Sequence, residues 1–483
     1  MFYILLSSLL LLFHYISKGT YGDVITVYDD EGNQFAIKLF QNDDEDEEDY
    51  DDESTECSDD EEDDIGKAMD IGALREISIL RLLRGENSHP NIIQIHDFKQ
   101  SDDVADYEDG GYNGNDIMSN MGLVMPLYHH GNLSKAIDSN MLTNKRMKVQ
   151  IAHGILCAVD FLHSNGIIHR DIKGDNVMLD FDEKKTGFFP VLIDFSLAKI
   201  IEPQVYMTAS NHDDVAKIKS LSADLVKENT HTPECGTPTY RAPEVVSQEP
   251  YHLASDMYSV GVVLLELLRG KTLEVVKDKD SLKLVKQELE QLPDQPFANL
   301  VRGLLEVDPE KRLSAKKALQ SDVFTKFGIL TEESKTKQSK IINIMEALPF
   351  DHYDENDPSN NNKTSIICKD KVLQKRMKLI RRIAHELGSV NELTIQAALM
   401  YSQQLSQLEC CDDLKESQAL CDCVVLAHQF FEKDIWNLRE IERIDSGIFR
   451  DFEWSAETYI DTESTLLMLV DFCLYPRQIL RFE

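Results

Sequence analysis

Apolar and polar residues alternate along residues 11–40, and two polar turns interrupt the alternation. A period of two is typical of strands that bury one face, so this stretch predicts three antiparallel strands. Residues 68–83 instead carry apolar side chains at every third or fourth position, which predicts a helix. Residues 91–98 and 123–127 are short apolar runs and predict two more strands. The first part of the chain is therefore expected to be rich in strands.

Helical periodicity dominates the middle of the chain. Residues 147–163 are amphipathic, residues 253–268 are strongly apolar, and residues 282–319 predict several short helices. Two short apolar strands are expected between the first two of these, at residues 177–179 and 190–193. An order of strands first and helices afterwards indicates an α+β fold with two lobes.

The last third of the chain predicts a linker and a further domain. Residues 327–370 are polar and contain three consecutive asparagines, as expected of a linker. Residues 371–483 return to helical periodicity, and residues 419–431 are apolar on almost every side. Such a helix is typical of the buried centre of a bundle. We therefore expect an all-α helical domain at residues 371–483.

The charge is strongly acidic and unevenly distributed. A net charge of −36 argues against binding to nucleic acid or to an anionic membrane, and we expect neither as a partner. Residues 41–65 hold seventeen Asp and Glu but no Lys or Arg, and they predict an acidic disordered insert. Residues 101–120 predict a second loop insert. The first insert is either a solvated spacer or, through Ser54, Thr55 and Ser58, a target for phosphorylation.

Cysteine content and the N-terminus bear on location. Nine cysteines are too few for a disulfide scaffold and their number is odd, so buried thiols in a reducing interior are expected. Residues 1–10 form an apolar extension that lacks the basic flank and cleavage site of a signal peptide, and it is too short to span a bilayer. An intracellular protein of the cytoplasm, the nucleus or both is expected. The basic run at residues 371–382 is either a nuclear signal or the solvated face of a helix.

The chemistry centres on residues 169–176, which read His-Arg-Asp-Ile-Lys-Gly-Asp-Asn. This order of charges predicts a catalytic loop for phosphoryl transfer. Asp171 is placed to accept the proton of an attacking hydroxyl, and Asn176 is placed to hold a metal ion. Lys173 is placed to stabilise the γ-phosphate, and a lysine there suits serine or threonine acceptors.

Other residues meet the remaining requirements of phosphoryl transfer from a nucleotide. Glycines in the hairpin of residues 17–24 let the backbone approach phosphates. Lys38 is expected to pair with the α- and β-phosphates and to be oriented by Glu76 on the following helix. Asp194, which follows an apolar strand, is expected to bridge the phosphates through Mg²⁺. ATP and Mg²⁺ are thus the expected cofactors.

These residues, taken in order, resemble the eukaryotic protein kinase family over residues 11–326. The resemblance implies a small strand-rich lobe over a larger helical lobe, with ATP between them and protein substrates as acceptors. Met125 then resembles the gatekeeper, and Leu127 lies in the hinge that binds adenine. The ATP-binding residues implied by the match are Gly19, Gly22, Val24, Ala36, Lys38, Met125 and Leu127.

Two structural roles are expected in the larger lobe. Glu244 lies in the sequence Ala-Pro-Glu, which closes a long activation segment at residues 194–244. Its expected ion-pair partner is Arg312. Asp256, near the start of the strongly apolar helix, is assigned a structural role.

Several stretches are more similar to the cyclin-dependent kinases, namely residues 19–22, 73–78, 240–244 and 308–316. This resemblance implies regulatory phosphorylation at Thr20, Tyr21 and Thr232. A phosphate on Thr232 would be held by a basic cluster that matches the family's: Arg75, Arg170 and Lys199.

Some positions depart from the pattern of the family. Ser17 and Ser196 stand where the family has glycine, and Gly174 stands where cyclin-dependent kinases carry proline. Residues 236–239 look more like other Ser/Thr kinases. The two serines are the support for an alternative function, a pseudokinase scaffold that binds partners without transferring phosphate.

The helical domain resembles a cyclin box, through residues 419–432 and 460–472. Gln429 stands where cyclins usually present a lysine to the kinase, and Glu463 matches the partner glutamate. The resemblance implies an activator in the same chain, kept at high effective concentration by the linker. The alternatives are an external cyclin, or an unrelated helical tail that recruits a substrate or partner.

Overall fold

The structure is a computed structural model, and the chain divides into two compact units. Residues 1–78, 95–127 and 365–483 belong to the first unit, and residues 79–94 and 128–364 to the second. The residues that the structure describes are 14–19, 22–28, 32–39, 71–100, 121–181, 188–200, 236–248, 253–329, 366–367, 371–388, 392–405, 413–431, 438, 441, 447–452, 454–456, 459, 463, 466–467, 474 and 480–481. The predicted extension at residues 1–10 and the inserts at 41–65 and 101–120 lie outside them.

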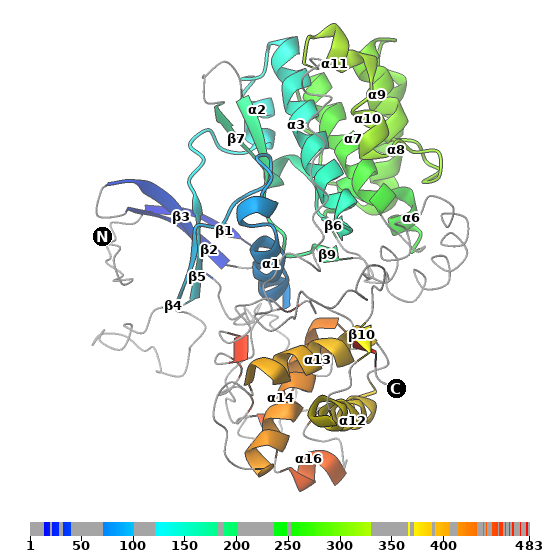
Figure 1. The fold of residues 1–483 in the computed structure, drawn as a ribbon. Helices are drawn as coiled ribbons and strands as arrows, with labels where there is room; N and C mark the ends of the chain where they lie inside the picture. Colours follow the sequence, from blue (N-terminus) through cyan, green and yellow to red (C-terminus); the bar gives the residue numbers. More distant parts are fainter. Residues whose placement is uncertain are drawn as a thin grey trace, which may run out of the picture. The chain divides into compact units, whose positions relative to one another are not determined.

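A five-stranded sheet forms the first part of the first unit (Figure 1). Its strands are β1 (His14–Gly19), β2 (Gly22–Tyr28), β3 (Gln34–Leu39), β4 (Asp97–Gln100) and β5 (Met121–Pro126). They lie in the order β1-β2-β3-β5-β4, and each neighbouring pair is antiparallel. The prediction of three antiparallel strands within residues 11–40 is therefore confirmed.

The register of the sheet separates two sets of side chains. Directly paired residues of antiparallel strands share a face, and alternate residues of one strand lie on opposite faces. One face carries the apolar core cluster of Ile25, Val27, Ile37 and Val124, against which Phe35 and Leu39 pack. The other face carries Lys38 together with the residues that pair with it or lie two positions away.

Helix α1 (Ile71–Leu82) confirms the helix predicted at residues 68–83. The strand predicted at residues 91–98 is wrong over most of its length, because β4 begins only at Asp97. The backbone before it pairs elsewhere: the Leu192 N–H donates to the Asn91 carbonyl (2.8 Å), and the Ile93 N–H donates to the Leu192 carbonyl (3.0 Å). Apolar residues alone did not reveal that these backbone groups have a partner outside the sheet.

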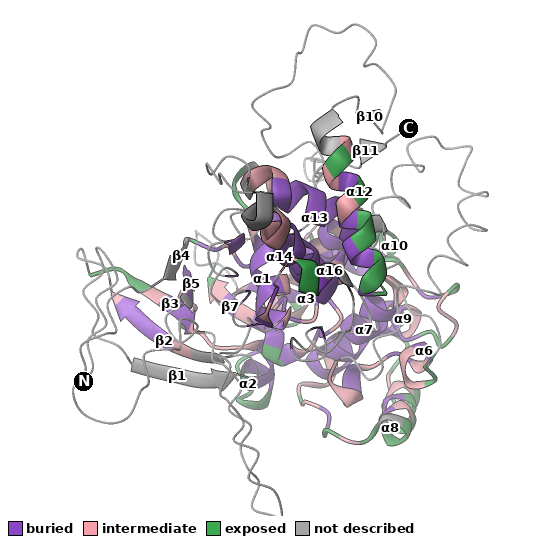
Figure 2. Ribbon diagram, turned by 90° about the horizontal axis from the view of Figure 1, so that it is seen from below, coloured by how far each residue is buried: buried purple, intermediate pink, exposed green. Residues whose placement is uncertain are grey.

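The helical part of the first unit contains α12 (Lys371–Glu386), α13 (Glu392–Leu405), α14 (Asp413–Phe431) and α16 (Gly447–Asp451). Helix α13 packs against both α12 and α14, and α14 is buried from Leu420 to Phe430, as Figure 2 shows. Strands β10 (Ile366–Ile367) and β11 (Leu480–Arg481) pair in parallel. Within the linker predicted at residues 327–370, the structure describes only residues 327–329 and 366–367, so the linker stays a prediction.

The second unit is mostly helical (Figure 1). Its helices are α2 (Leu133–Asp138), α3 (Lys145–Ser164), α6 (Pro243–Val246), α7 (Leu253–Arg269), α8 (Asp278–Glu290), α9 (Pro296–Leu304), α10 (Ala315–Ala318) and α11 (Asp322–Lys326). Its strands are β6 (Ile167–Ile168), β7 (Val177–Phe181), β8 (Phe188–Leu192) and β9 (Lys199–Ile200). Single turns of 3-10 helix lie at Gly85–Asn87, Gly174–Asn176 and Pro238–Tyr240.

Helix α7 lies at the centre of this unit and contacts α3 and α9. Its residues from Ser255 to Leu267 are all buried, so its strongly apolar sequence is accounted for. The predicted helices at residues 147–163, 253–268 and 282–319 are confirmed, with α8 beginning slightly earlier. In the part of the chain that the structure describes, no helix is both long and apolar enough to cross a membrane.

Candidate active site

Lys38 and Glu76 form the predicted pair. The Lys38 Nζ lies 2.6 Å from the Glu76 Oε2, and the two side chains are only 9% and 4% exposed. Lys38 comes from the middle of the sheet, between its β2 partner Val24 and its β5 partner Leu123, and Glu76 comes from α1. A buried ammonium that is ion-paired keeps its charge and one orientation. The pair therefore holds a cation on one face of the sheet.

The residues predicted to bind a nucleotide gather around this cation. Val24 and Lys38 are paired, as are Ala36 and Met125, so all four side chains lie on the same face of the sheet. Leu127 follows directly after β5. Gly19 and Gly22 are paired at the end of the β1–β2 hairpin, while Thr20 and Tyr21 lie outside the described residues.

Asp171 is the centre of a hydrogen-bonded cluster in the second unit. Its Oδ2 lies 2.8 Å from the Lys173 Nζ and accepts a hydrogen bond from the Asn176 Nδ2 (2.9 Å). Its Oδ1 accepts hydrogen bonds from the Thr237 N–H (3.1 Å) and the Thr237 hydroxyl (3.0 Å). The Lys173 Nζ also donates to the Thr237 Oγ1 (2.9 Å). Four donors thus fix the carboxylate that was predicted to be the catalytic base.

The strand pairing explains why the two predicted metal ligands come together. Strands β7 and β8 are antiparallel with Val177 opposite Leu192, so the residue before β7 lies beside the end of β8. The Ile193 N–H accordingly donates to the Asn176 carbonyl (2.9 Å). Asn176 directly precedes Val177, and Asp194 lies two residues after Leu192. Both residues are therefore at the same end of the β7–β8 hairpin.

The donor atoms of this pair fit Mg²⁺. Asn176 uses its amide nitrogen for both bonds to Asp171, so its amide oxygen is the atom that suits a metal. Asp194 adds a carboxylate, and Mg²⁺ prefers a small number of such oxygen ligands. Buried thiols were expected for the clustered cysteines, and Cys421 and Cys423 are buried on α14, whereas Cys157 on α3 is only partly buried. In the described residues, no group of three or more His, Cys, Asp and Glu is arranged as a further metal site.

Asp256 at the start of α7 holds the backbone of the catalytic loop. Its two oxygens accept hydrogen bonds from the His169 N–H and the Arg170 N–H, both at 2.9 Å, and Oδ2 lies 2.9 Å from the His163 Nε2. Burial alone would raise the pKa of Asp256, but His163 and the other donors outweigh it and lower the pKa. Arg170 has a φ of +68°, which is uncommon for a non-glycine residue, so the loop depends on these bonds.

Glu244 and Arg312 form the predicted ion pair. The Arg312 guanidinium donates from Nη1 to Oε1 (2.7 Å) and from Nη2 to Oε2 (2.9 Å). Both residues are buried, and the guanidinium lies 5.2 Å from the centre of the Tyr258 ring. Burial acts to raise the pKa of Glu244, but the bidentate pair with Arg312 lowers it overall.

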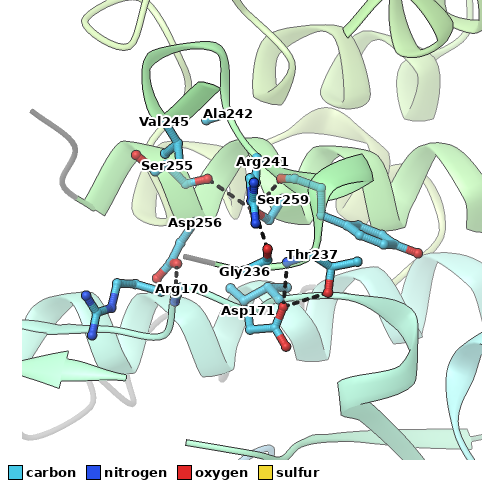
Figure 3. A pocket seen from close by; sticks show the side chains of 12 residues that line it. Arg170, Asp171, Gly236, Thr237, Arg241, Ala242, Val245, Ser255, Asp256 and Ser259 are labelled. Carbon is cyan, nitrogen blue, oxygen red and sulfur yellow. Dashed lines mark hydrogen bonds between the residues drawn. The ribbon is translucent and has the colours of Figure 1, made fainter. Parts of the chain in front are cut away.

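The segment around Gly236 comes very close to the catalytic loop. Gly236 has a φ of +87°, and a β-carbon there would lie 2.5 Å from the Arg170 carbonyl oxygen. The Arg241 Nε donates to the Gly236 carbonyl (2.8 Å). A cavity of about 20 Å³, room for about one water molecule, lies between this segment and the loop. Figure 3 shows the cavity and the bonds between Asp171 and Thr237 beside it.

The structure places only part of the predicted phosphate-binding cluster. Lys199 pairs with Ile168 in the β6–β9 ladder. Because Ile168 lies two residues before Arg170, this pairing brings the backbones of Lys199 and Arg170 close together. The Arg170 Nε donates to the Leu197 carbonyl (2.5 Å). Arg75 belongs to α1 in the first unit, and Thr232 lies outside the described residues.

The two residues that were matched to the lysine and glutamate positions of a cyclin box, Gln429 and Glu463, lie in the interior of the helical domain. Gln429 and Glu463 are buried, and the Tyr459 hydroxyl lies 3.0 Å from an oxygen of each. Gln429 and Glu463, which are far apart in the sequence, therefore lie near each other. They are connected through Tyr459, which was not part of the matched stretches.

Gly174 has a local explanation. A β-carbon on Gly174 would lie 2.5 Å from the Ser134 Oγ and 3.2 Å from the Ser134 backbone nitrogen. Ser134 is in turn bonded to Asp175 in the same loop (3.2 Å). The approach of α2 to the catalytic loop therefore requires glycine here, whereas proline would need more space.

Sequence reasoning missed Thr237 as a partner of Asp171. The residue is 66 positions away along the chain, and its neighbour Pro238 and the glycine before it were noted only as a family pattern. The signal that was present is the Gly-Thr-Pro order itself. A glycine able to adopt a positive φ next to a hydroxyl residue allows the chain to approach the loop closely.

Glu266 on α7 is a buried carboxyl outside the catalytic cluster. It is fully buried and accepts hydrogen bonds from the Tyr240 hydroxyl (3.1 Å) and the Leu273 N–H (2.7 Å). Burial raises the pKa of Glu266 to about 7, although both hydrogen bonds oppose the rise. The charges of Asp175 and Asp138 raise this pKa further.

Replacing Glu266 with glutamine is expected to favour the folded state more at pH 8 than at pH 6. A raised carboxyl pKa contributes its stabilisation fully below pH 4.5, the ordinary value, and this is lost as the pH rises through about 7. The unfolding free energy of the variant minus that of the wild type should rise by about 1 kcal/mol between pH 6 and pH 8. Urea denaturation at both pH values measures it, and a difference that does not change with pH would contradict this assignment.

Comparisons with known proteins identify relatives of this chain. Residues 12–324 match the model of the family described as the protein kinase domain. The serine/threonine-protein kinase DCLK3 of Mus musculus is 29% identical over 255 residues, which cover 51% of this chain and 26% of that protein. A probable myosin light chain kinase of Dictyostelium discoideum is 30% identical over 264 residues, which cover 51% of this chain and 67% of that protein.

A third relative is the calcium/calmodulin-dependent protein kinase type 1B of Rattus norvegicus, 30% identical over 257 residues that cover 51% of this chain and 60% of that protein. For the first three relatives the match covers only 26%, 24% and 20% of their own length.

Proposed function

Because this chain belongs to the protein kinase family, we propose that it transfers the γ-phosphoryl group of ATP to serine or threonine hydroxyls of protein substrates. The observation that carries the proposal is the cluster in which Lys173, Asn176 and Thr237 all contact the carboxylate of Asp171, the predicted base. Relatives named serine/threonine-protein kinase support the choice of acceptor.

Asp171 acts on the acceptor hydroxyl. Its carboxylate orients the hydroxyl and takes up the proton as the new oxygen–phosphorus bond forms and the bond between the γ-phosphorus and the β-phosphate oxygen breaks, which releases ADP. The Lys173 ammonium, 2.8 Å from this carboxylate, supplies positive charge where negative charge builds up on the transferring group. Thr237 fixes the carboxylate from the other side, so the base does not have to reorganise during the reaction.

Nucleotide and metal binding fall to the remaining residues. Lys38, held by Glu76, would bind the α- and β-phosphates, and the apolar side chains of Val24, Ala36, Met125 and Leu127 would contact the base. Asn176 and Asp194 would hold Mg²⁺, which when bound neutralises charge on the phosphates. A pseudokinase scaffold is disfavoured for two reasons. The backbone of Ser196 has no positive φ and so does not need glycine, and its hydroxyl forms a hydrogen bond to the Asp194 carboxylate instead of pushing that carboxylate away.

The assay that tests the proposal is transfer of label from γ-labelled ATP to a peptide library. The full chain should label peptides, and Lys38→Met should lower kcat/KM by about 10²- to 10³-fold because the phosphates lose their positioned cation. Lys279→Met, which removes an exposed lysine of α8, is the matched control and should retain activity. Equal activity of Lys38→Met and wild type would contradict the assigned role.

A finer proposal concerns the cyclin-dependent type. It is supported by the motifs of the sequence and by the membership of residues 365–483 in the same unit as the sheet and residues 71–78 of α1. In the same assay, deletion of residues 371–483 should lower activity if the helical domain is an activator. Full activity of the truncated chain would count against that role.

A further inference from the structure

Ser196 lies two residues after Asp194 and contacts its side chain. The serine is 2% exposed, and its hydroxyl donates a hydrogen bond to the Asp194 Oδ1 at 2.7 Å. The Ser196 N–H approaches the same oxygen at 3.5 Å. A buried hydroxyl thus holds one oxygen of the carboxylate that is assigned to the metal, at a position where the family has glycine.

The backbone of Asp194 is fixed on both sides but has an unfavourable conformation. Its φ is +65°, in the left-handed region that non-glycine residues rarely adopt. Before it, the Ile193 carbonyl lies 3.1 Å from the His169 Nε2, and after it the Phe195 ring packs edge-on against His169 at 4.9 Å. The Ala198 N–H closes a turn onto the Phe195 carbonyl (3.0 Å). The backbone on both sides of Asp194 is therefore anchored, and the Ser196 hydroxyl adds a contact to its side chain.

We propose that Ser196 is a positioning residue for Mg²⁺, whose hydroxyl holds the Asp194 carboxylate in the orientation that binds the metal. The inference rests on the proposed function. A ligand fixed before the metal arrives loses less conformational entropy on binding, and hydrogen-bond partners of metal ligands commonly set metal affinity for this reason.

Ser196→Ala is expected to raise the Mg²⁺ concentration for half-maximal ATP binding by about tenfold. Nucleotide binding in EDTA should not change, because the hydroxyl acts only through the carboxylate. In turnover, the loss should appear mainly in the KM for Mg²⁺–ATP and less in kcat. Ser196→Cys, which keeps the volume of the side chain but donates a weaker hydrogen bond, should give an intermediate Mg²⁺ requirement.

Calorimetric titration of the full chain with ATP over a series of MgCl₂ concentrations measures this requirement. Ser255→Ala is the matched control, because it removes a buried hydroxyl that bonds to another carboxylate, Glu244, at 3.0 Å. Its Mg²⁺ requirement should equal that of the wild type. Asp194→Asn should abolish the Mg²⁺ dependence.

The outcomes separate two failures. If the wild type binds ATP without any dependence on Mg²⁺, the proposed function fails and the role of Ser196 fails with it. If the wild type depends on Mg²⁺ while Ser196→Ala and Ser196→Cys show the same requirement as the wild type, the proposed function stands and the role of Ser196 is overturned. An equal shift for Ser255→Ala would also overturn it, because the effect would then be one of general stability.

Discussion

Replacing Asp171 with asparagine is expected to lower kcat for peptide phosphorylation by about 10²- to 10⁴-fold. Asparagine keeps the shape of the side chain but cannot accept the hydroxyl proton. It also brings an NH₂ group to a site where both oxygens face donors, Lys173 and Asn176 on one side and Thr237 on the other. The KM for ATP should change little, because Asp171 is not assigned to the nucleotide. Steady-state kinetics of the full chain measure both constants.

Asp175→Asn is the matched control for this prediction. It makes the same chemical change four residues later in the same loop, at an exposed carboxylate bonded to Asn132 and Ser134, both at 3.2 Å. Its kcat should remain close to the wild-type value. Comparable losses in the two variants would mean that loop structure, and not the carboxylate of Asp171, controls the rate.

Replacing Arg312 with methionine is expected to lower the unfolding free energy of the second unit by about 3–5 kcal/mol. The variant leaves the buried Glu244 carboxylate without its bidentate partner, while Ser255 still donates to it at 3.0 Å. It also removes the hydrogen bonds that the guanidinium donates to the carbonyls of Ala254 and Glu306, at 2.7 and 2.9 Å. Chemical denaturation followed by far-ultraviolet circular dichroism measures the loss.

The neighbouring residue supplies the control. Lys311→Met removes an adjacent positive charge whose partner, Asp308, lies on the surface at 3.0 Å. Exposed pairs contribute little to stability, so this variant should unfold at nearly the same denaturant concentration as the wild type. If the two variants lose the same stability, the buried pair has no special role.

The parts of the site that sequence predicted well are those where chemistry forces a residue type. A phosphate-binding lysine needs a carboxylate, and the order of the motifs identified Lys38 and Glu76 although 38 positions separate them. Asp171, Asn176 and Asp194 were found in the same way. Regular periodicity located α3 and α7, because a long amphipathic or apolar helix leaves an unambiguous pattern.

The missed features depend on backbone geometry and on distant partners. The Gly-Thr-Pro order is the signal for Thr237, but it does not say that the residue bonds to Asp171, and nothing in the sequence marks Ser134 as the neighbour of Gly174. The early strand predicted at residues 91–98 failed because its backbone groups pair with Leu192, about a hundred residues later. Ser196 looked like a loss of function in sequence, whereas its hydroxyl contacts the carboxylate of Asp194.

The most direct test of the account is the identity of the residue that receives phosphate. The full chain would be incubated with Mg²⁺, γ-labelled ATP and a peptide library, and the labelled amino acids would be identified after hydrolysis. Label is expected on serine and threonine, and Asp171→Asn should transfer it about 10²- to 10⁴-fold more slowly than the wild type. Label recovered only as ATP or inorganic phosphate, or transfer by Asp171→Asn at the wild-type rate, would contradict the assigned function.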